Sequence, residues 1–273
     1  MSRVRPFFVA TLTNAIRPGT YGVVMSLFTG FFSAVLTLVS PATFAYVVPG
    51  SPTSSLDKPL VILDPGHGGD DPGAHIQGVI EKDLCLAIAK RLKADLERRG
   101  VPTRLSRESD VSLPLDQRVA ESGQWQHAIF ISLHMNQMWH QAKPHGIIVY
   151  SYGREEIAEK KPGLKLPPLA PPSSELARQS ARLGDRIARQ FRKRGFKARG
   201  VVKTDYYVLK NPNHPSVLVE LGFLTNPSER RRLAQTGYQN KLSETLSNGI
   251  ESFLRDREVA TMTAALDASG SRR

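Results

Sequence analysis

A glycine-rich stretch carries two side chains that are able to bind a metal ion. It reads VILDPGHGGDDPGAHIQGVIEKDLCL over residues 61–86, with His67 inside it and Glu81 near its end. Its five glycines and two prolines predict a tightly shaped loop, because glycine reaches backbone angles that other residues avoid. Residues 61–63 have the pattern of a short buried strand, and the periodic segment from Leu84 onward has that of a helix. The loop therefore follows the carboxyl end of a strand, where open α/β sheets place their ligands.

A second histidine occupies an equivalent position. His134 directly follows the apolar run AIFISL of residues 128–133. The carboxyl ends of parallel strands share one rim, so we expect His67 and His134 to lie close together. With the carboxylate of Glu81 they would make three protein ligands, the number typical of hydrolytic zinc with one position left for water. Spacing alone indicates this only weakly, since the chain has no HExxH pair. His75, in the middle of the loop, is expected at the surface.

A further carboxylate stands in the segment SVLVELGFLTNPSE. Glu220 lies at the end of a strongly apolar strand, where a charge is costly unless a cation or hydrogen bonds compensate it. One interpretation is a structural glutamate that caps a helix or forms a salt bridge. The interpretation that we favour is a general base at the same rim, with a pKa tuned by burial and by a nearby cation.

Strands and helices alternate along the chain and must position these side chains. The expected strands are residues 60–63, 102–106, 128–133, 146–150, 206–209 and 217–221, and the expected helices are residues 84–99, 116–124, 175–194, 227–235 and 238–255. Such alternation predicts a single α/β domain with a mostly parallel or mixed twisted sheet and helices on both faces. The zinc site is expected at the C-terminal rim of the strands.

The N-terminal 45 residues differ in composition from the rest. They contain three arginines, no acid and, from residue 22 to 39, a nearly continuous apolar run. This pattern predicts a secretory signal peptide, with cleavage after Ala45. An uncleaved membrane anchor is the alternative, because the run approaches the length needed to span a bilayer. In either case the domain is exported, to the periplasm or the medium, or stays anchored to the membrane.

The remaining boundaries follow from proline, serine and small polar residues. Residues 46–58 are expected to form a linker, and residues 59–255 the catalytic domain. Residues 153–173 contain five prolines near their end, which neither a helix interior nor a central strand accepts. We expect this insert to be a mobile rim. The alternative is an inhibitory plug whose carboxylates occupy the open coordination position of the metal site. The tail, residues 256–273, is expected to be disordered.

Charge and cysteine content narrow the class of partner. The 273 residues carry a formal net charge of +12, and loss of the three N-terminal arginines would leave +9. For an exported protein this surplus favours wall polymers or lipid headgroups over nucleic acid. Much of it lies in residues 178–199, which we interpret first as a solvated helix face and where no interleaving of aromatic residues indicates base stacking. The single cysteine, Cys85, excludes an internal disulfide and is expected to be buried and inert.

Four motifs occur in a familiar order: DPGHGGDDPGA with Glu81 downstream, LSRESDVSLPLDQRV, FISLHMN and VLVELGFLTNPSE. The chain resembles, over about residues 59–255, the zinc-dependent N-acetylmuramoyl-L-alanine amidases of the family-3 catalytic type. The resemblance implies a peptidoglycan hydrolase that cuts between N-acetylmuramic acid and the L-alanine of the stem peptide. It also implies that His67, Glu81 and His134 bind one Zn²⁺ and that Glu220 is the catalytic glutamate.

Several other polar residues lie in or near these motifs. Asp64 and Asp71 are expected to organise the loop or to orient a ligand from behind it. Asn136 is expected either to donate a hydrogen bond to substrate or to stabilise a turn. Arg107 and Arg118 match family positions, and we expect structural pairing from them.

Two other functions fit parts of the same pattern. A zinc peptidase acting on the stem peptide would use similar ligands, and a non-catalytic wall-binding protein would share the fold. The second would be marked by loss of a ligand or of the base, and here all four positions are filled. The expected partners are peptidoglycan and an activator protein that the sequence does not identify.

Overall fold

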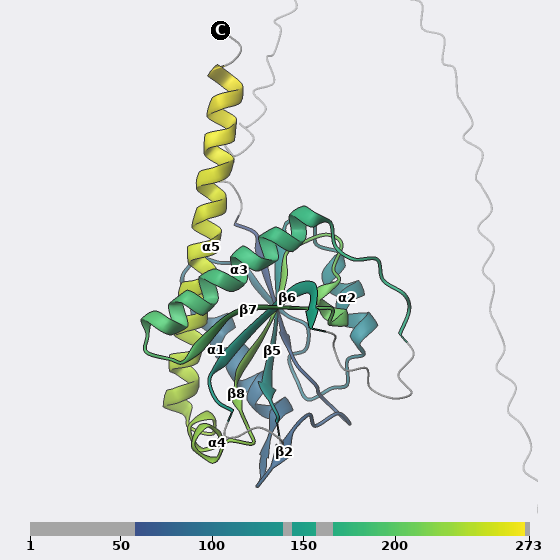
Figure 1. The fold of residues 1–273 in the computed structure, drawn as a ribbon, viewed down its shortest axis with the longest axis vertical. Helices are drawn as coiled ribbons and strands as arrows, with labels where there is room; N and C mark the ends of the chain where they lie inside the picture. The colour runs from purple at the N-terminus through teal and green to yellow at the C-terminus, as the bar shows by residue number, and fades with distance from the viewer. Residues whose placement is uncertain (1–57, 139–143, 157–165, 271–273) are drawn as a thin grey trace, which may run out of the picture. The chain divides into compact units, whose positions relative to one another are not determined.

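The computed structural model describes residues 58–138, 144–156 and 166–270. A six-stranded sheet in the order β4-β1-β5-β8-β6-β7 forms its centre (Figure 1). The first four of these strands run parallel, β6 runs antiparallel to β8, and β7 runs parallel to β6. The expected mixed sheet is thus confirmed. The strands are β1 (Leu60–Pro65), β4 (Thr103–Leu105), β5 (Ala128–Asn136), β6 (Ile147–Glu156), β7 (Ala198–Thr204) and β8 (Ser216–Phe223), and β2 (His75–Ile76) pairs with β3 (Val79–Ile80) in a separate hairpin.

Helices lie on both faces of the sheet, as expected. One face carries the long helices and the larger core, and the other carries a short helix and a single 3₁₀ turn. Local sequence begins two of these helices: the side chains of Ser173 and Asn226 accept hydrogen bonds from backbone N–H groups of the first turns. The helices of the first face are α1 (Glu81–Arg98), α3 (Ser174–Lys193), α4 (Pro227–Leu233) and α5 (Thr236–Gly270), and those of the second are α2 (Leu115–Gly123) and η1 (Tyr207–Leu209).

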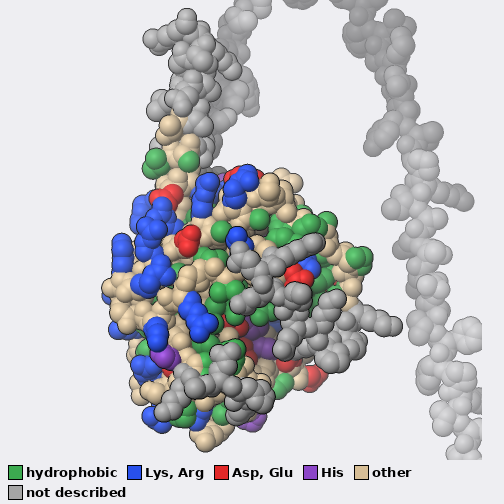
Figure 2. Space-filling view, viewed as in Figure 1, with side chains coloured by type: hydrophobic (Ala, Val, Ile, Leu, Met, Phe, Trp, Pro, Cys, Tyr) green, Lys and Arg blue, Asp and Glu red, His purple; other side chains and the backbone are tan. Residues whose placement is uncertain are grey.

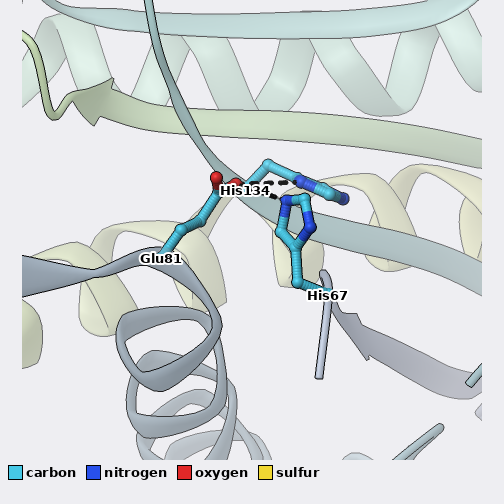
Figure 3. Close-up of side chains that lie close together, drawn as sticks. All are labelled: His67, Glu81 and His134. Atoms are coloured by element: carbon cyan, nitrogen blue, oxygen red, sulfur yellow. Dashed lines mark hydrogen bonds and ion pairs between the residues drawn. The ribbon is translucent and has the colours of Figure 1, made fainter. Parts of the chain in front are cut away.

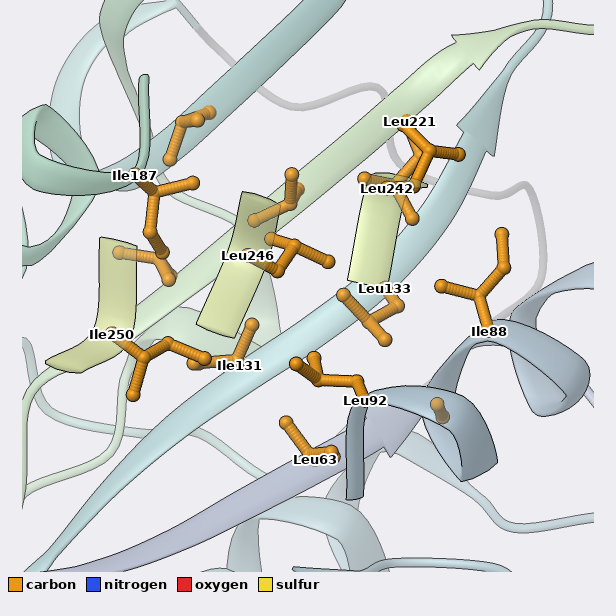
Figure 4. Packing of buried hydrophobic residues seen from close by; sticks show 14 of the residues in the cluster. Leu63, Ile88, Leu92, Ile131, Leu133, Ile187, Leu221, Leu242, Leu246 and Ile250 are labelled. Carbon is orange, nitrogen blue, oxygen red and sulfur yellow. The ribbon is translucent and has the colours of Figure 1, made fainter. Parts of the chain in front are cut away.

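The larger core lies between the sheet and the long helices. Figure 4 shows strand residues such as Leu63 and Leu133 packed against Leu92 of α1 and Leu246 of α5. Successive side chains of a strand point to opposite faces. Leu133 faces this core, so His134 beside it points to the other face, together with Phe130 of the smaller core. Alternation in β5 therefore sends the histidine away from the main core and toward the less covered face.

Two expectations about the third quarter of the chain are wrong. Residues 207–209 form the turn η1 and not a strand, while an unexpected edge strand, β7, covers residues 198–204. The apolar run at 207–209 is too short to distinguish a strand from a buried turn by its pattern. β7 is largely exposed and carries Arg199 and Lys203, which suits an edge strand but hides it from a search for apolar runs.

The C-terminal tail also differs from expectation. Residues 256–270 continue α5 and extend it beyond the sheet (Figure 1). This segment reads DREVATMTAALDASG, in which alanine, methionine and leucine favour a helix and no proline interrupts it. None of the helices in the described ranges is long and apolar enough to cross a membrane. The predicted export segment, the linker up to residue 57 and residues 271–273 lie outside the described residues.

The direction of β6 decides where the insert leaves the sheet. Because β6 runs antiparallel to β8, its end at Glu156 lies at the edge opposite the carboxyl ends of β1, β5 and β8. The chain therefore leaves β6 for the insert at the edge opposite the rim that carries His134. Residues 157–165 lie outside the described residues, and Pro167 accepts a hydrogen bond from the hydroxyl of Tyr207.

Candidate metal centre

Three side chains from three segments meet at the rim of the sheet. His67 comes from the loop after β1, Glu81 from the first residue of α1, and His134 from the end of β5 (Figure 3). One potential ligand atom from each lies within 4.8 Å of the others. Oε1 of Glu81 is 3.0 Å from Nε2 of His67 and 3.1 Å from Nδ1 of His134. The structure therefore brings together the three residues that the sequence singled out.

Backbone amides fix the Glu81 carboxylate. Ala74 donates its N–H to Oε2 at 2.8 Å, and Met135 donates its N–H to Oε1 at 3.0 Å. The position at the beginning of α1 adds the favourable dipole of a helix N-terminus. Glu81 thus joins the glycine loop, α1 and the end of β5.

Two glycines allow the three side chains to approach the backbone this closely. A Cβ atom on Gly66 would lie 2.4 Å from Cε1 of His134. Gly73 has a φ of +65°, and a Cβ there would lie 2.6 Å from both Oε2 of Glu81 and Cδ2 of His67. Any larger residue at either position would displace His134, His67 or Glu81, which explains part of the glycine content of the loop.

The backbone of His67 is held in an unfavourable conformation. Its φ is +59°, in the left-handed region that residues other than glycine seldom adopt. Arg118 donates from Nη2 to the carbonyl of His67 at 2.6 Å, and Arg107 donates to the carbonyls of Pro65 and Gly66 at 3.0 and 2.7 Å. These buried arginines compensate the loop carbonyls and keep the imidazole aimed at the rim.

The two aspartates of the loop act in different ways. Asp71 places Oδ2 2.9 Å from Nδ1 of His67, the arrangement that fixes the tautomer of a metal-binding histidine. Asp64 is buried and accepts hydrogen bonds from Ser106, Ser132 and Arg118. Asp64 acts on the loop indirectly, because Arg118, which it binds, also donates to the carbonyl of His67. Its burial opposes ionisation, but the Arg118 charge and the hydroxyl groups outweigh this and lower its pKa.

We expect Asp64→Asn to lower the free energy of unfolding at neutral pH by about 3–5 kcal/mol, because it leaves the Arg118 guanidinium buried without its counter-charge. The folded-state pKa of Asp64 is depressed, so its contribution is present above the unfolded pKa of about 3.9 and is lost as the pH falls through the folded value. The difference in free energy of unfolding between wild type and variant should accordingly decrease at acidic pH. Urea titrations at several pH values measure this difference.

The matched control is Asp185→Asn, at an exposed position of α3, where a change within about 0.5 kcal/mol is expected. A loss for Asp64→Asn no larger than that of the control would contradict the bracing role of Asp64.

The donor set of the three-residue cluster suits a bound cation. Burial opposes ionisation of Glu81, yet hydrogen bonds and charge interactions with His134 and His67 outweigh it and lower its pKa strongly. Glu81 is therefore an anion that two imidazoles face. Two nitrogen donors and one carboxylate in this arrangement match the donor set of a hydrolytic zinc site. The residues present fit the ion that the resemblance implies.

Glu220 lies beside this cluster. It is the register partner of His134 between β5 and β8, so both side chains point to the same face. Its Oε2 atom is shielded from solvent and has no hydrogen-bond partner within the described part of the chain. Burial raises the pKa of Glu220 well above its ordinary value, and the negative charge of Glu81 raises it further. A carboxyl group with one shielded, unpartnered oxygen at this point is suited to proton transfer.

The remaining candidates have less defined surroundings. Asn136 is half-buried, its carbonyl accepts the N–H of Leu224 at 2.9 Å, and no side-chain hydrogen bond is recorded for it among the described residues. Its role toward substrate stays a prediction. His75 is exposed, as expected. Cys85 is fully buried and its pKa is raised by burial, which agrees with an inert thiol.

The sequence reading missed a latch behind the loop. Lys82 places Nζ 2.7 Å from Oδ2 of Asp110 and donates to the carbonyl of Gly69 at 2.8 Å, while Gly69 donates its N–H to Oδ1 of Asp110 at 2.8 Å. Ser112 accepts the N–H of Asp70 at 3.1 Å. In the sequence, LSRESDVS stands out only as part of the resemblance. The ion pair between Lys82 and Asp110 could not be predicted from the sequence, because 28 residues separate the two.

The fold and the cluster define a class of protein: an α/β domain with a candidate hydrolytic metal site at the rim of its parallel strands. The model of the N-acetylmuramoyl-L-alanine amidase family 3 matches residues 61–252. The chain belongs to this family of hydrolases, as the resemblance implied.

Relatives and solved structures agree with this assignment. The N-acetylmuramoyl-L-alanine amidase AmiA of Salmonella typhimurium is 32% identical over 224 residues, covering 72% of this chain and 76% of the relative. The amidase AmiC2 of Nostoc punctiforme superposes with a TM-score of 0.57 at 33% identity, covering 72% of this chain and 98% of that one. The CwlD amidase of Clostridioides difficile, solved in complex with the GerS lipoprotein, gives a TM-score of 0.60 at 29% identity and the same coverage.

Proposed function

We propose that this amidase is zinc-dependent, with His67, Glu81 and His134 as the metal ligands and Glu220 as the general base. The observation that carries the proposal is the cluster itself: three donor atoms within 4.8 Å of one another, beside a carboxyl group whose Oε2 is shielded and unpartnered. Zinc bound there would supply a Lewis acid that polarises the scissile carbonyl and acidifies a water molecule.

The protein's own residues would perform the proton transfers. Glu220 would accept the proton of the attacking water and return it to the departing nitrogen of L-alanine. Its raised pKa makes it a stronger base than an exposed carboxylate once it is ionised. Asp71 would keep His67 in one tautomer, and the two backbone amides would hold Glu81 in place. No serine or cysteine nucleophile is required, and Cys85 is buried away from solvent.

The proposed substrate is peptidoglycan, cut between N-acetylmuramic acid and the L-alanine of the stem peptide. Family membership and the amidase relatives support this choice. We propose further that residues 1–45 direct export, that the domain works outside the cytoplasm, and that an activator protein assists it. Support for an activator comes from the related CwlD amidase, which was solved with the GerS lipoprotein.

Mass spectrometry of digested peptidoglycan tests the proposed function. Intact stem peptides should be released, and a chelator should stop their release until zinc is added back. Shortened stem peptides would support a zinc peptidase in its place, and no soluble product would support a non-catalytic wall-binding protein. Release that continues in chelator would contradict metal dependence.

Replacement of the middle of the insert should have little effect on the rate of hydrolysis. Replacing residues 157–165 by a short Gly-Ser segment is expected to change hydrolysis of purified peptidoglycan by less than tenfold, because β6 ends at the edge opposite the metal-site rim. A second variant keeps the length and neutralises the acids of the insert: Glu155→Gln, Glu156→Gln and Glu159→Gln together. An increase of roughly tenfold or more in either variant, about 1.4 kcal/mol in the barrier, would show that the insert is an inhibitory plug.

A further inference from the structure

A concave site lies at the same edge of the sheet as the metal-site rim but on the face of the long helices. It is a pocket of about 280 Å³, formed where β6 begins, α3 ends and α5 begins. Phe196 and Tyr238 in its wall pack against the larger core. Four cations line it: Arg194, Lys197, Arg232 and Lys241. We call it the basic pocket.

The acid in the pocket wall does not cancel this charge. Glu229 is buried, and its two carboxylate oxygens accept the N–H groups of Gly146 and Phe223 at 3.0 and 2.8 Å. Arg232 forms a longer ion pair with it at 3.7 Å, and Arg194 pairs with Glu244 at 2.5 Å. The Glu229 carboxylate is thus bound mainly by the backbone at the start of β6 and the end of β8, and Lys197 and Lys241 supply the surplus positive charge of the pocket.

Ring faces and a histidine hold the cations in place. Lys241 lies 5.1 Å from the ring centre of Phe196, and Arg232 lies 5.5 Å from that of Tyr238. Nζ of Lys197 is 2.9 Å from Nε2 of His145. No acidic partner is recorded for either lysine in the described ranges. Such contacts orient an ammonium group without neutralising it, so both charges remain available to a ligand.

A row of cations continues from the pocket along α3. Residues 174–204 contain ten basic and two acidic residues, a surplus of eight in a chain of net charge +12. Arg182, Arg189 and Lys193 are exposed on α3. Arg182 interacts with the charge of Glu175, and among the described residues no acid is recorded as a partner of Arg189 or Lys193. At 1.5 Å per residue, the distance along the helix from Arg182 to Arg194 is roughly 18 Å. Figure 2 shows Lys and Arg side chains gathered over α3 and α5. We call this row the basic track.

We propose that the basic pocket binds a phosphate group and that the basic track extends this contact to a linear polymer with repeated phosphates. A phosphate offers several oxygens and more than one negative charge, which matches several Lys and Arg donors converging on one pocket better than a single carboxylate does. Repeated charges on the polymer would meet the cations spaced along α3. This binding activity is additional to the proposed amidase function.

A membrane surface fits these observations less well. Proteins that lie on membranes insert apolar side chains between the lipids. The large hydrophobic side chains that are exposed in the described ranges are Val111, Trp125 and Val259, and none of them belongs to α3 or to the pocket. A recessed pocket also suits a flexible chain better than a plane of headgroups.

Fluorescence anisotropy of labelled polyphosphate with the purified full chain tests the proposal. Lys197→Gln combined with Lys241→Gln is expected to raise the Kd about tenfold. The slope of log K against log salt concentration should also become shallower by an amount that corresponds to roughly two fewer phosphate contacts. Neither lysine belongs to the metal centre, so hydrolysis of a soluble muropeptide should be unchanged. Because the readout is binding, its result does not depend on the amidase assignment.

The matched control removes two exposed cations from α1, with Lys90→Gln and Arg98→Gln, and should change the Kd by less than about twofold. Equal losses in both double variants would show a general charge effect and overturn the pocket. Absence of binding by wild type would overturn the proposal altogether. Tighter binding to phosphatidylglycerol vesicles than to polyphosphate, lost in the pocket variant, would replace the polymer by a membrane.

Discussion

His134→Ala should abolish zinc binding and amidase activity together. The variant leaves two ligands, His67 and Glu81, and two protein ligands do not make a stable zinc site. His134 is half-exposed, with 21% of its side chain accessible, so its removal from the rim should not unfold the domain. Metal analysis of the purified variant and its rate on peptidoglycan measure both effects.

The control for this experiment is His75→Ala. His75 belongs to the same glycine-rich region but is exposed and lies outside the cluster, so zinc content and rate should match those of wild type. Stoichiometric zinc in His134→Ala, or equal loss in both variants, would contradict the ligand assignment.

Glu220→Gln should keep the fold and the metal and lose most turnover. The amide has nearly the same shape as the carboxyl group, but it cannot accept the proton of water. Loss of a general base typically costs about 10²–10⁴ in rate. The raised pKa of Glu220 also predicts the acid limb of the rate profile: activity falls as the pH decreases through this pKa, because the base becomes protonated. That limb should be absent from the residual activity of the variant.

Glu81→Gln is the informative comparison for Glu220→Gln. Both variants change a carboxylate of the same site, but we propose that Glu81 binds the metal. It should lose zinc, whereas Glu220→Gln should retain it. If Glu220→Gln works within a factor of a few of wild type, the base must be another residue. If it loses zinc, Glu220 is a ligand and not a base.

The positions of the four central residues were predictable from the sequence for a simple physical reason. His67, His134 and Glu220 each follow or end an apolar run, and the carboxyl ends of parallel strands meet at one rim. Glu81 begins a helix whose apolar period is plain. Strand ends are thus marked by a change from apolar to polar residues, which one sequence displays.

What could not be predicted rests on contacts between distant segments. The arginines that hold the loop carbonyls lie 41 to 53 residues away from them, and no local pattern announces such pairs. The reversal of β6 was also invisible, because an antiparallel strand buried on both faces has the same apolar run as a parallel one. Edge strand β7 is too polar to resemble a strand, and α5 continues through residues whose helix preference was overlooked.

The two backbone hydrogen bonds to Glu81 have a consequence for metal exchange. A carboxylate held by Ala74 and Met135 has already lost its rotamer freedom when the polypeptide folds, so little ordering entropy remains to oppose capture of the ion. Folding and metal uptake should then be separable events, unlike those of a zinc finger, which is unfolded without its metal. With the proposed export and zinc dependence, the polypeptide would fold before it meets zinc and would become active when the ion arrives.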